Sequence, residues 1–384
     1  MGFFWACLFS HRYPSISGGS RKLRAGAKLE TMNDLLESVT SSPRLFPYSM
    51  DLGSDSVSFI HLAKADYEKA SFLDPRVLNP QTRARSLPWA EIARAIDAAQ
   101  LKERLGFIFH IGHVGSTLLS RLIGAHSCAF SLREPLLLRG FTQLKNEPRQ
   151  APAAWGSDGF AARLTCTLQL FSRTFEEREL PVVKASSFVS ELSETLLSRS
   201  SSPKAIMMFV SPENYIATIL GGPNSRQEAK LLTPDRLQRL QRRIGCEPWH
   251  AEQLSEGETL AVAWACEMSA LAQAAESSAA RLLHVDFDQF LINPSSLLDI
   301  LRHFDIDATA AEAQTILEGP DMRRYSKAPE YAYDAALRHQ VLKEARALHA
   351  AEIHRGLAWL DRAAKKWPAI GRAISLSHMP HRRA

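Results

Sequence analysis

The sequence predicts a three-layer α/β domain, in which helices cover both faces of a central parallel β-sheet. Three observations predict this fold class. Short apolar runs with the length of a buried strand recur along the chain, and stretches with helical spacing of apolar residues separate them. Parallel strands need such crossover connections, and strands buried on both faces are apolar throughout. A turn with two glycines also follows the first apolar run and leads into a helix, which is where α/β folds often bind a ligand.

The predicted elements alternate in chain order. Four apolar runs are predicted as buried strands, at residues 106–111, 180–185, 205–210 and 281–287. Five stretches are predicted as helices between and after them, at residues 116–125, 187–198, 212–220, 259–280 and 294–304. Pro212 and Pro294 support two of the helix starts because the first helical turn tolerates proline, and Asn293 is a suitable N-cap.

The chain divides into four predicted regions. Residues 1–31 are basic and rich in glycine and serine, which predicts a disordered leader, and Met32 is an alternative start. Residues 32–104 are predicted as a mixed segment packed on the core, and the core itself covers residues 105–310. Residues 311–384 are predicted to be helical with a basic tail, and their amphipathic stripe indicates packing on the core or on a partner.

The net charge of +5 comes from the ends of the chain. Residues 1–31 and 365–384 together hold ten of the 46 basic residues and only one of the 41 acidic residues. Residues 32–364, the body of the chain, therefore have a net charge of −4. A mildly acidic body argues against a nucleic-acid partner. The apolar stretch at the N-terminus is too short for a membrane span, and the five cysteines show no disulfide or zinc spacing. These patterns predict a cytoplasmic protein without a membrane span.

The turn at residues 110–117, HIGHVGST, is predicted to bind a phosphate group. Gly112 and Gly115 allow a tight turn and a close approach of the backbone to a ligand. Consecutive N–H groups and the start of the next helix can then converge on an anion, and Ser116 and Thr117 add hydroxyl donors. The first glycine and the lysine of an ATP-binding loop are replaced here by histidine and serine, which argues against a grip on β- and γ-phosphates with Mg²⁺.

The segment HIGHVGSTLLSRLI resembles the 5′-phosphosulfate loop of the sulfotransferase family, which commonly places a proline and a basic residue before a Gly-Thr-Thr sequence. His113 falls where the family usually has Lys or Arg. The resemblance implies a P-loop NTPase-like sulfotransferase architecture, with 3′-phosphoadenosine-5′-phosphosulfate (PAPS) as the sulfuryl donor and no metal. The loop residues implied to bind the donor are Gly112, His113, Val114, Gly115, Ser116 and Thr117.

Four later segments resemble the same family in the same order, so that the resemblance covers about residues 105–305. LREPLLLRG places Glu134 at an acceptor-site position, and PVVKASSFVSELSETL places Lys184 at a strand end. KAIMMFVSPENYIATIL resembles the segment that binds the 3′-phosphate, where Thr218 matches the family's serine but Val210 replaces its arginine. The segment at residues 263–304 is similar to the family's Trp-containing helix, the strand after it and the closing helix.

The reaction implied by this resemblance moves a sulfuryl group from PAPS to an acceptor hydroxyl or amine, and positioning with preorganised donors carries most of such catalysis. The implied catalytic residues are His113, Glu134 and Lys184. His113 is predicted to donate to the bridging oxygen, since imidazole titrates near neutrality, unless the loop backbone satisfies it. Glu134 is predicted as the general base with a raised pKa, and a salt bridge to Arg133 or Arg139 is the alternative.

The remaining candidates would bind the donor. Lys184 is predicted to contact its sulfonate or phosphate because an unpaired buried ammonium is costly, and a pair with an acid is the alternative. Arg226 is predicted to supply the guanidinium missing at Val210, unless it is a solvated loop residue. Thr218 is predicted to bond the 3′-phosphate or its own helix backbone. The segment MRRYSKAPEY, residues 322–331, matches a late basic lid in position only, with a plain surface loop as the alternative.

Two other functions stay open. A nucleoside or small-molecule kinase shares the sheet and the loop, and would use Asp286 or Asp288 for a metal. A catalytically inactive nucleotide-binding module of the same fold is favoured by Val210 and His113. The acceptor is predicted to be a small molecule, a carbohydrate or a peptide, and the sequence carries no signal for the oligomeric state.

Overall fold

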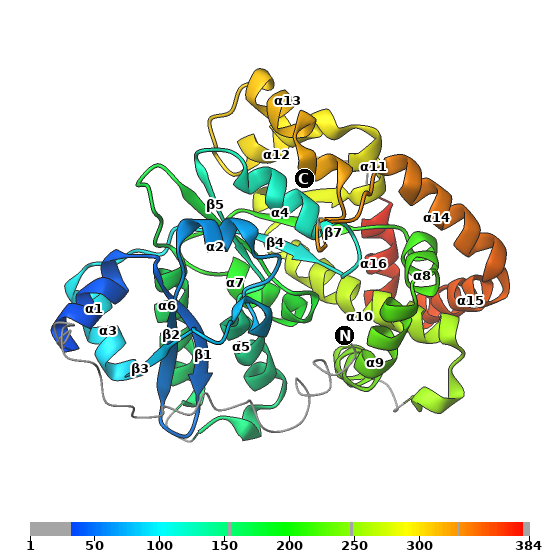
Figure 1. The fold of residues 1–384 in the computed structure, drawn as a ribbon. Coiled ribbons are helices and arrows are strands. Elements are labelled where there is room, and N and C mark those ends of the chain that lie inside the picture. The colour runs from blue at the N-terminus through cyan, green and yellow to red at the C-terminus, as the bar shows by residue number, and fades with distance from the viewer. Residues whose placement is uncertain (1–31, 153–154, 246–248, 329, 379–384) are drawn as a thin grey trace.

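At the centre of the structure lies a parallel β-sheet of five strands in the spatial order β5-β6-β4-β7-β8 (Figure 1). This computed structural model describes residues 32–152, 155–245, 249–328 and 330–378, so the predicted leader and the end of the basic tail lie outside the described residues. The strands are β4 (Gly106–His110), β5 (Ala129–Arg133), β6 (Leu180–Lys184), β7 (Ala205–Phe209) and β8 (Leu282–Asp286). The predicted parallel sheet is confirmed, and the four predicted strands are four of these five.

Strand β5, which forms one edge of the sheet, is not among the predicted strands. Every residue of β5 is buried, yet its run is interrupted by polar side chains. Ser131 shares a hydrogen bond of 2.6 Å with Ser120, and Arg133 donates to the backbone carbonyls of Tyr67 and Ala70. Polar groups satisfied in this way can be buried, so a search for uninterrupted apolar runs overlooks such a strand.

Nine helices belong to this central part of the described chain: α4 (Ser116–Gly124), α5 (Leu136–Asn146), α6 (Gly156–Phe171), α7 (Ser193–Leu197), α8 (Pro212–Leu220), α9 (Pro223–Ile244), α10 (Glu256–Glu276), α11 (Phe287–Ile292) and α12 (Leu297–His303). Helices α4 and α12 contact each other on one face of the sheet, and α7 and α10 contact each other on the opposite face (Figure 1). The three-layer arrangement is therefore as predicted. Two predicted helices begin with 3₁₀ turns, at residues 187–192 and 294–296, and α5, α6, α9 and α11 are additional to the prediction.

The segment before the core contains a second sheet. Its three antiparallel strands are β1 (Leu45–Asp51), β2 (Ser56–His61) and β3 (Ala84–Pro88), and its helices are α1 (Met32–Ser41), α2 (Lys64–Lys69) and α3 (Trp89–Ala98). The buried guanidinium of Arg173, just after α6, donates to the backbone carbonyls of Val39, Ser42 and Leu45. This arginine links the N-terminal segment to the central part of the chain, because its removal would break three hydrogen bonds to backbone carbonyls of that segment.

Four further helices follow the core: α13 (Ala310–Glu318), α14 (Ala335–Leu348), α15 (Ala350–Lys366) and α16 (Pro368–Ser377). Helices α15 and α16 pack on α10, and α14 packs on α8. The predicted amphipathic stripe thus covers the core, with Trp359 and Leu360 buried. None of the helices in the described ranges has the length and apolar content needed to cross a membrane.

The position of β4 determines where a ligand can bind. Strand β4 lies in the middle of the sheet and pairs with β6 on one side and with β7 on the other. The chain runs from β4 to the β5–β6 side first and crosses to the β7–β8 side afterwards, so the connections diverge at the end of β4. In open parallel sheets this switch point is where a crevice for ligands forms, beyond the carboxyl ends of the strands.

Candidate functional site

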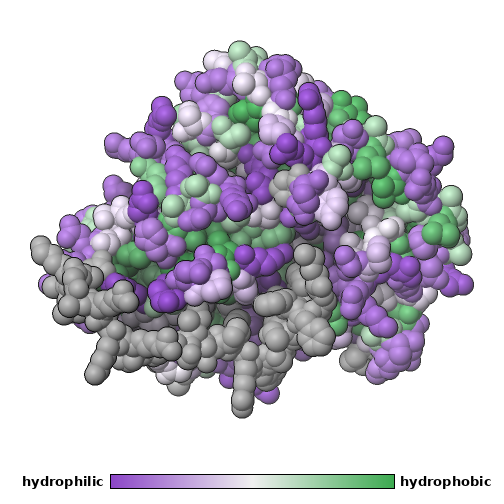
Figure 2. Space-filling model, in the orientation of Figure 1, coloured by the Kyte–Doolittle hydropathy of each residue, from purple (hydrophilic) through white to green (hydrophobic). Residues whose placement is uncertain are grey.

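A cavity of about 1520 Å³ opens at the carboxyl ends of these strands. Typical ligand pockets have volumes of roughly 300–1,000 Å³, so this one has room for two substrates. Its walls come from the loop between β4 and α4, from β6, and from facing sides of α5 and α9. Phe72 from the N-terminal segment, and residues 325–327 and Arg338 from the C-terminal segment, also contribute to the lining. The face shown in Figure 2 is mostly polar, with apolar residues gathered in a recess near its middle.

The predicted phosphate loop lines this cavity with all six of its predicted residues, Gly112, His113, Val114, Gly115, Ser116 and Thr117. Gly112 and Gly115 have φ angles of +86° and +66°, in the left-handed region that favours glycine. A Cβ on Gly115 would lie 2.0 Å from the ring of Phe287, so the position also requires a close approach of the backbone. The loop ends in α4, whose first residues Ser116 and Thr117 are buried against the cavity.

Two of the predicted catalytic residues adopt the same left-handed conformation without being glycine. His113 has a φ angle of +56° and Glu134 one of +54°. Residues other than glycine rarely adopt this left-handed region, because the conformation costs them about 1–2 kcal/mol per residue. Such strained residues gather at functional sites, where the surrounding structure holds them in place.

Several buried hydrogen-bonding atoms around the cavity have no partner in the part of the chain that the structure describes. They are Thr117 Oγ1, His110 Nε2, Ser186 Oγ and Arg338 Nη2, and all four residues line the cavity. An unpaired buried donor costs about 1–3 kcal/mol, so four at one cavity point to a ligand that satisfies them. All four can donate a hydrogen bond, which fits an anionic, oxygen-rich ligand.

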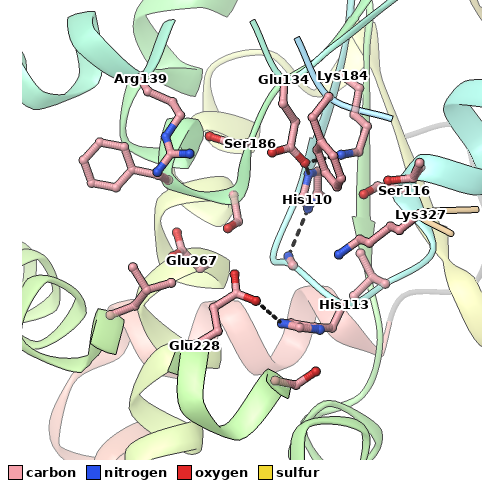
Figure 3. Close-up of a pocket in the computed structure, with 18 of the residues that line it drawn as sticks. His110, His113, Ser116, Glu134, Arg139, Lys184, Ser186, Glu228, Glu267 and Lys327 are labelled. Carbon is pink, nitrogen blue, oxygen red and sulfur yellow. Dashed lines mark hydrogen bonds and ion pairs between the residues drawn. The ribbon is translucent and has the colours of Figure 1, made fainter. Parts of the chain in front are cut away.

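Glu134 and Lys184 form an ion pair at the wall of the cavity (Figure 3). The alternative of a salt bridge from Glu134 to Arg133 or Arg139 is therefore wrong: Arg133 is held by backbone carbonyls, and Arg139 acts on Glu134 only as a more distant charge that helps to lower its pKa. The expectation of a raised pKa is wrong as well. Burial alone would raise the pKa of Glu134, but the neighbouring Lys184 ammonium outweighs burial and lowers it.

His110 stands behind this ion pair at the end of β4. Its Nδ1 accepts a hydrogen bond of 3.0 Å from the Gly112 N–H, so the ring proton lies on Nε2. Nε2 is 3.9 Å from Glu134 Oε1 (Figure 3). Burial and the Lys184 ammonium lower the pKa of His110 well below its ordinary value, so the ring is neutral at pH 7. The histidine thus holds the phosphate loop by one nitrogen and faces the carboxylate with the other.

His113 points from the loop into the cavity, where its Nε2 lies 3.8 Å from Glu228 Oε2 of α9 (Figure 3). Burial, with the nearby charges of Lys327 and Arg236, lowers the pKa of His113 well below its ordinary value. The predicted titration near neutrality is therefore wrong for this state of the protein. A neutral imidazole still offers one N–H donor to a ligand.

The structure separates the residues predicted to bind a 3′-phosphate. Thr218 lines the cavity, but its hydroxyl donates to the Asn214 carbonyl of its own helix at 2.6 Å. Arg226 does not line the cavity and is paired with Glu256 at the surface, so the prediction that it replaces the missing arginine is not supported. Val210 is fully buried, and its carbonyl accepts a hydrogen bond from Trp264, which belongs to the hydrophobic core.

Arg338 of α14 brings a guanidinium to this part of the cavity instead. Its Nε is bonded to Asp288 at 2.5 Å, its plane lies 4.9 Å from the centre of the Phe287 ring, and its Nη2 has no partner among the described residues. Phe287 is the ring against which Gly115 packs. The free edge of the arginine is therefore held beside the phosphate loop by two fixed contacts.

The late segment at residues 322–331 is more than a plain surface loop. Figure 3 shows Lys327 pointing into the cavity beside Ser116 and His113. The preceding Ser326 carbonyl accepts hydrogen bonds from Arg121 of α4 at 3.0 Å and from Ser71 at 3.2 Å. These two bonds fix the segment against the helix that begins at the phosphate loop, and so position the ammonium.

The carboxylates that a kinase would use are engaged elsewhere. Asp286 caps α11 by accepting from the N–H groups of Asp288 and Gln289. Asp288 is paired with Arg338 and accepts from Asn214. Neither aspartate lines the cavity, and the residues that the structure describes hold no group of three or more His, Cys, Asp or Glu with metal-binding geometry.

Sequence reasoning missed several residues of the site: His110, Ser186, Glu228, Lys327 and Arg338. His110 is the second-last residue of a predicted strand, where its polar side chain is a signal that could have been used. Ser186 follows Lys184 closely and shares its strand end. Glu228, Lys327 and Arg338 give no such signal, because long-range packing of α9, the late segment and α14 brings them to the cavity.

Comparisons with known proteins give structural similarity at low sequence identity. No protein-family model matches the chain, and no curated protein matches it. A sulfotransferase domain from the curacin biosynthetic pathway is 16% identical, with 68% of this chain and 99% of that chain covered and a TM-score of 0.35. A sulfotransferase domain from the Synechococcus PCC 7002 olefin synthase is 15% identical, covers 68% and 94%, and has a TM-score of 0.37. Sulfotransferase STF9 from Mycobacterium avium is 12% identical, covers 85% and 98%, and has a TM-score of 0.35. The chain is similar to these three sulfotransferases, and at such TM-scores its function has to be inferred from its own residues.

Proposed function

We propose that the protein is a sulfotransferase that moves a sulfuryl group from PAPS to an acceptor hydroxyl or amine. One observation carries the proposal: unpaired buried donors surround a glycine-rich phosphate loop in a cavity with room for two substrates. An ammonium and a carboxylate that face each other lie in the same cavity. The site is thus equipped for an anionic donor and for an acceptor with an exchangeable proton.

The residues present fit the two ends of such a donor. The loop N–H groups, the hydroxyls of Ser116 and Thr117, and the start of α4 would hold the 5′-phosphosulfate. The free edge of Arg338 would meet the 3′-phosphate, because a planar guanidinium matches phosphate oxygens. Arg338 would then bind the 3′-phosphate in place of the family's arginine, which is Val210 here and which Arg226 does not replace. Lys327 adds an ammonium on the loop side of the cavity.

When bound, PAPS supplies an activated sulfuryl group whose leaving partner is a phosphate. The neutral ring of His113 can donate its N–H to an oxygen that gains negative charge, without first being protonated. The Lys184 ammonium stabilises negative charge in the same region. The Glu134 carboxylate stays ionised at neutral pH and can accept the hydrogen of the acceptor group, which orients that group for attack.

The decisive experiment measures binding of 3′-phosphoadenosine-5′-phosphate (PAP) and of ATP with Mg²⁺ by titration calorimetry. We expect PAP to bind the wild type, and a Ser116→Ala, Thr117→Ala double variant to bind it at least tenfold more weakly, because hydrogen bonds to a charged group are lost. The control variant removes two exposed helical hydroxyls, Thr315→Ala and Ser375→Ala. Its PAP affinity should equal that of the wild type, and circular dichroism should show all three proteins folded.

Each of the other possible outcomes would point to a different site or function. Unchanged PAP affinity in the double variant would remove the phosphate loop from the site. Binding of ATP with Mg²⁺ but not of PAP would indicate the kinase. Binding of neither nucleotide would indicate a module of this fold that no longer handles a donor.

A further inference from the structure

One cation of the cavity, Arg139, is not among the residues proposed above to hold the donor. Arg139 on α5 lines the cavity and is half-buried, and within the described residues its guanidinium has no hydrogen-bond or ion-pair partner. Figure 3 shows it pointing into the cavity from the side opposite His113 and Lys327. A partly desolvated guanidinium is more stable with a carboxylate or another oxyanion on its planar edge.

The nearby acids do not neutralise Arg139. Glu134 is paired with Lys184, although the charge of Arg139 also helps to lower the pKa of this carboxyl group, and Asp235 on the facing helix α9 is paired with Arg239 at 2.7 Å. Glu267, at the base of the same wall, is held by Arg236 and Arg239. Among the described residues on this side of the cavity, where α5 and α9 line it, Arg139 thus has no acid within ion-pair distance.

A second unsatisfied donor lies on the same face of α5. Asn146 lines the cavity, and its Nδ2 is buried without a partner among the described residues. Arg139 and Asn146 are seven residues apart, which places them on one helix face about 10.5 Å apart along the axis. Gln143 lines the cavity between them; its Nε2 donates to Gln150 Oε1 at 3.2 Å, and its amide oxygen has two acceptor positions. This wall thus offers one charged and one neutral donor, separated by an amide.

We propose that this wall of α5 binds the acceptor, and that the acceptor is an extended polyhydroxylated carboxylate. Its carboxylate meets Arg139, its hydroxyl groups meet the amides of Gln143 and Asn146, and its reacting hydroxyl lies at Glu134. Glu134 begins the turn into α5, so one chain can reach both points. The inference rests on the proposed sulfotransferase function, and it adds the class of acceptor to it.

The Arg139 guanidinium could equally bind the sulfonate of the donor. The first arm of the test therefore distinguishes binding of the donor sulfonate from binding of an acceptor carboxylate. PAP and PAPS affinities are measured for the wild type, for Arg139→Gln, and for Lys145→Gln as a control on the same helix. Lys145 is exposed and contacts the Glu191 carbonyl and Thr195 instead of the cavity. We expect all three proteins to bind both nucleotides within a factor of two. A loss of tenfold or more in Arg139→Gln alone would assign this arginine to the donor and overturn the proposal.

The second arm titrates the PAP-loaded proteins with lactobionate and with lactobionamide, two disaccharide derivatives that differ in a carboxylate and an amide. We expect the wild type and Lys145→Gln to bind lactobionate at least fivefold more tightly than lactobionamide. Arg139→Gln should lose this preference, with its lactobionamide affinity unchanged within a factor of two. Equal affinity of the two probes for the wild type, or binding of neither by a protein that does bind PAP, would overturn the proposal. Failure of the wild type to bind PAP would instead overturn the proposed function itself.

Discussion

Two residues of the candidate site are held in a backbone conformation that their side chains disfavour. His113 and Glu134 lie on different loops, at the ends of β4 and β5, and both have φ angles near +55°. The left-handed turn at each position aims the side chain into the cavity instead of along its strand (Figure 3). Backbone strain at both positions is what we expect where stability is given up for function.

Replacing His113 by glycine tests whether the strained backbone costs stability and whether the side chain is needed for activity. His113→Gly relieves the left-handed strain but removes the side chain that faces Glu228. We expect the free energy of unfolding to stay within about 1 kcal/mol of the wild type, since glycine adopts positive φ without cost. Turnover of PAPS should fall at least tenfold. Urea denaturation and a sulfuryl-transfer assay check the two parts.

Gln100→Gly is the matched control, because Gln100 also has a positive φ, of +51°, but lies outside the cavity. It should relieve strain to a similar extent and leave turnover unchanged. A His113→Gly protein with full turnover would show that the loop histidine has no role in the reaction.

If the proposed donor binds beside Lys184, we expect its affinity to depend on pH. Burial lowers the pKa of Lys184 from 10.5 to about 8, although the Glu134 carboxylate opposes this change. The ammonium is therefore present below pH 8 and is lost as the pH rises through that value. Because the cation favours an anionic ligand, we expect the Kd of PAP to be constant from pH 6.5 to 7.5 and to rise above pH 8. Calorimetric titrations between pH 6.5 and 9.5 measure it.

Lys184→Arg retains a charge over this whole range, so its PAP affinity should not fall between pH 8 and 9.5. Lys184→Met should bind PAP more weakly than the wild type at pH 7, and its Kd for PAP should not rise further above pH 8. A wild-type Kd that stays constant up to pH 9.5 would mean that Lys184 does not act on the donor.

At the scale of elements, α9 forms one wall of the cavity without an apolar face of ordinary width. It buries the charged side chains Arg236 and Arg239, which Glu267 of α10 holds at 2.8–3.2 Å. Ser190 donates a further hydrogen bond of 2.5 Å to the same carboxylate. Helix α9 is not predicted from the sequence, because two of its buried positions hold ion-paired arginines where an amphipathic helix usually has apolar residues such as leucine.

Glu267→Gln should destabilise the protein, because it leaves two buried guanidinium groups without their counter-charge. Burial alone would raise the pKa of Glu267, but Arg239 and Arg236 lower it below its ordinary value. The carboxylate is thus ionised, and its contribution present, at all pH values above the ordinary pKa, and it is lost only in stronger acid. We expect the free energy of unfolding to fall by about 3 kcal/mol at both pH 5 and pH 8.

The matched control is Glu276→Gln on the same helix, whose exposed ion pair with Arg372 contributes less than about 1 kcal/mol. Chemical denaturation of both variants gives the comparison. Equal stability of the two variants would show that the buried cluster does not hold α9 in place.

At the scale of the whole molecule, the sequence predicts the architecture better than the site. Uninterrupted apolar runs identify β4, β6, β7 and β8, because strands buried on both faces have little freedom in composition. The phosphate loop is predicted for the same kind of reason, since its glycines and hydroxyls are local requirements. The pairing of Glu134 with Lys184 and the entry of Arg338 depend on contacts between residues far apart in the chain, which no local pattern records.

The cavity draws its walls from every region of the described chain. Phe72 comes from the segment before the core, and Lys327 and Arg338 come from the segment after it. A piece of the chain limited to residues 105–310 would keep the phosphate loop but lose these three side chains. The candidate site therefore cannot be transferred with the sheet alone: gene fusions or truncations that preserve the sheet would still lack the side chains that the flanking segments contribute to the cavity.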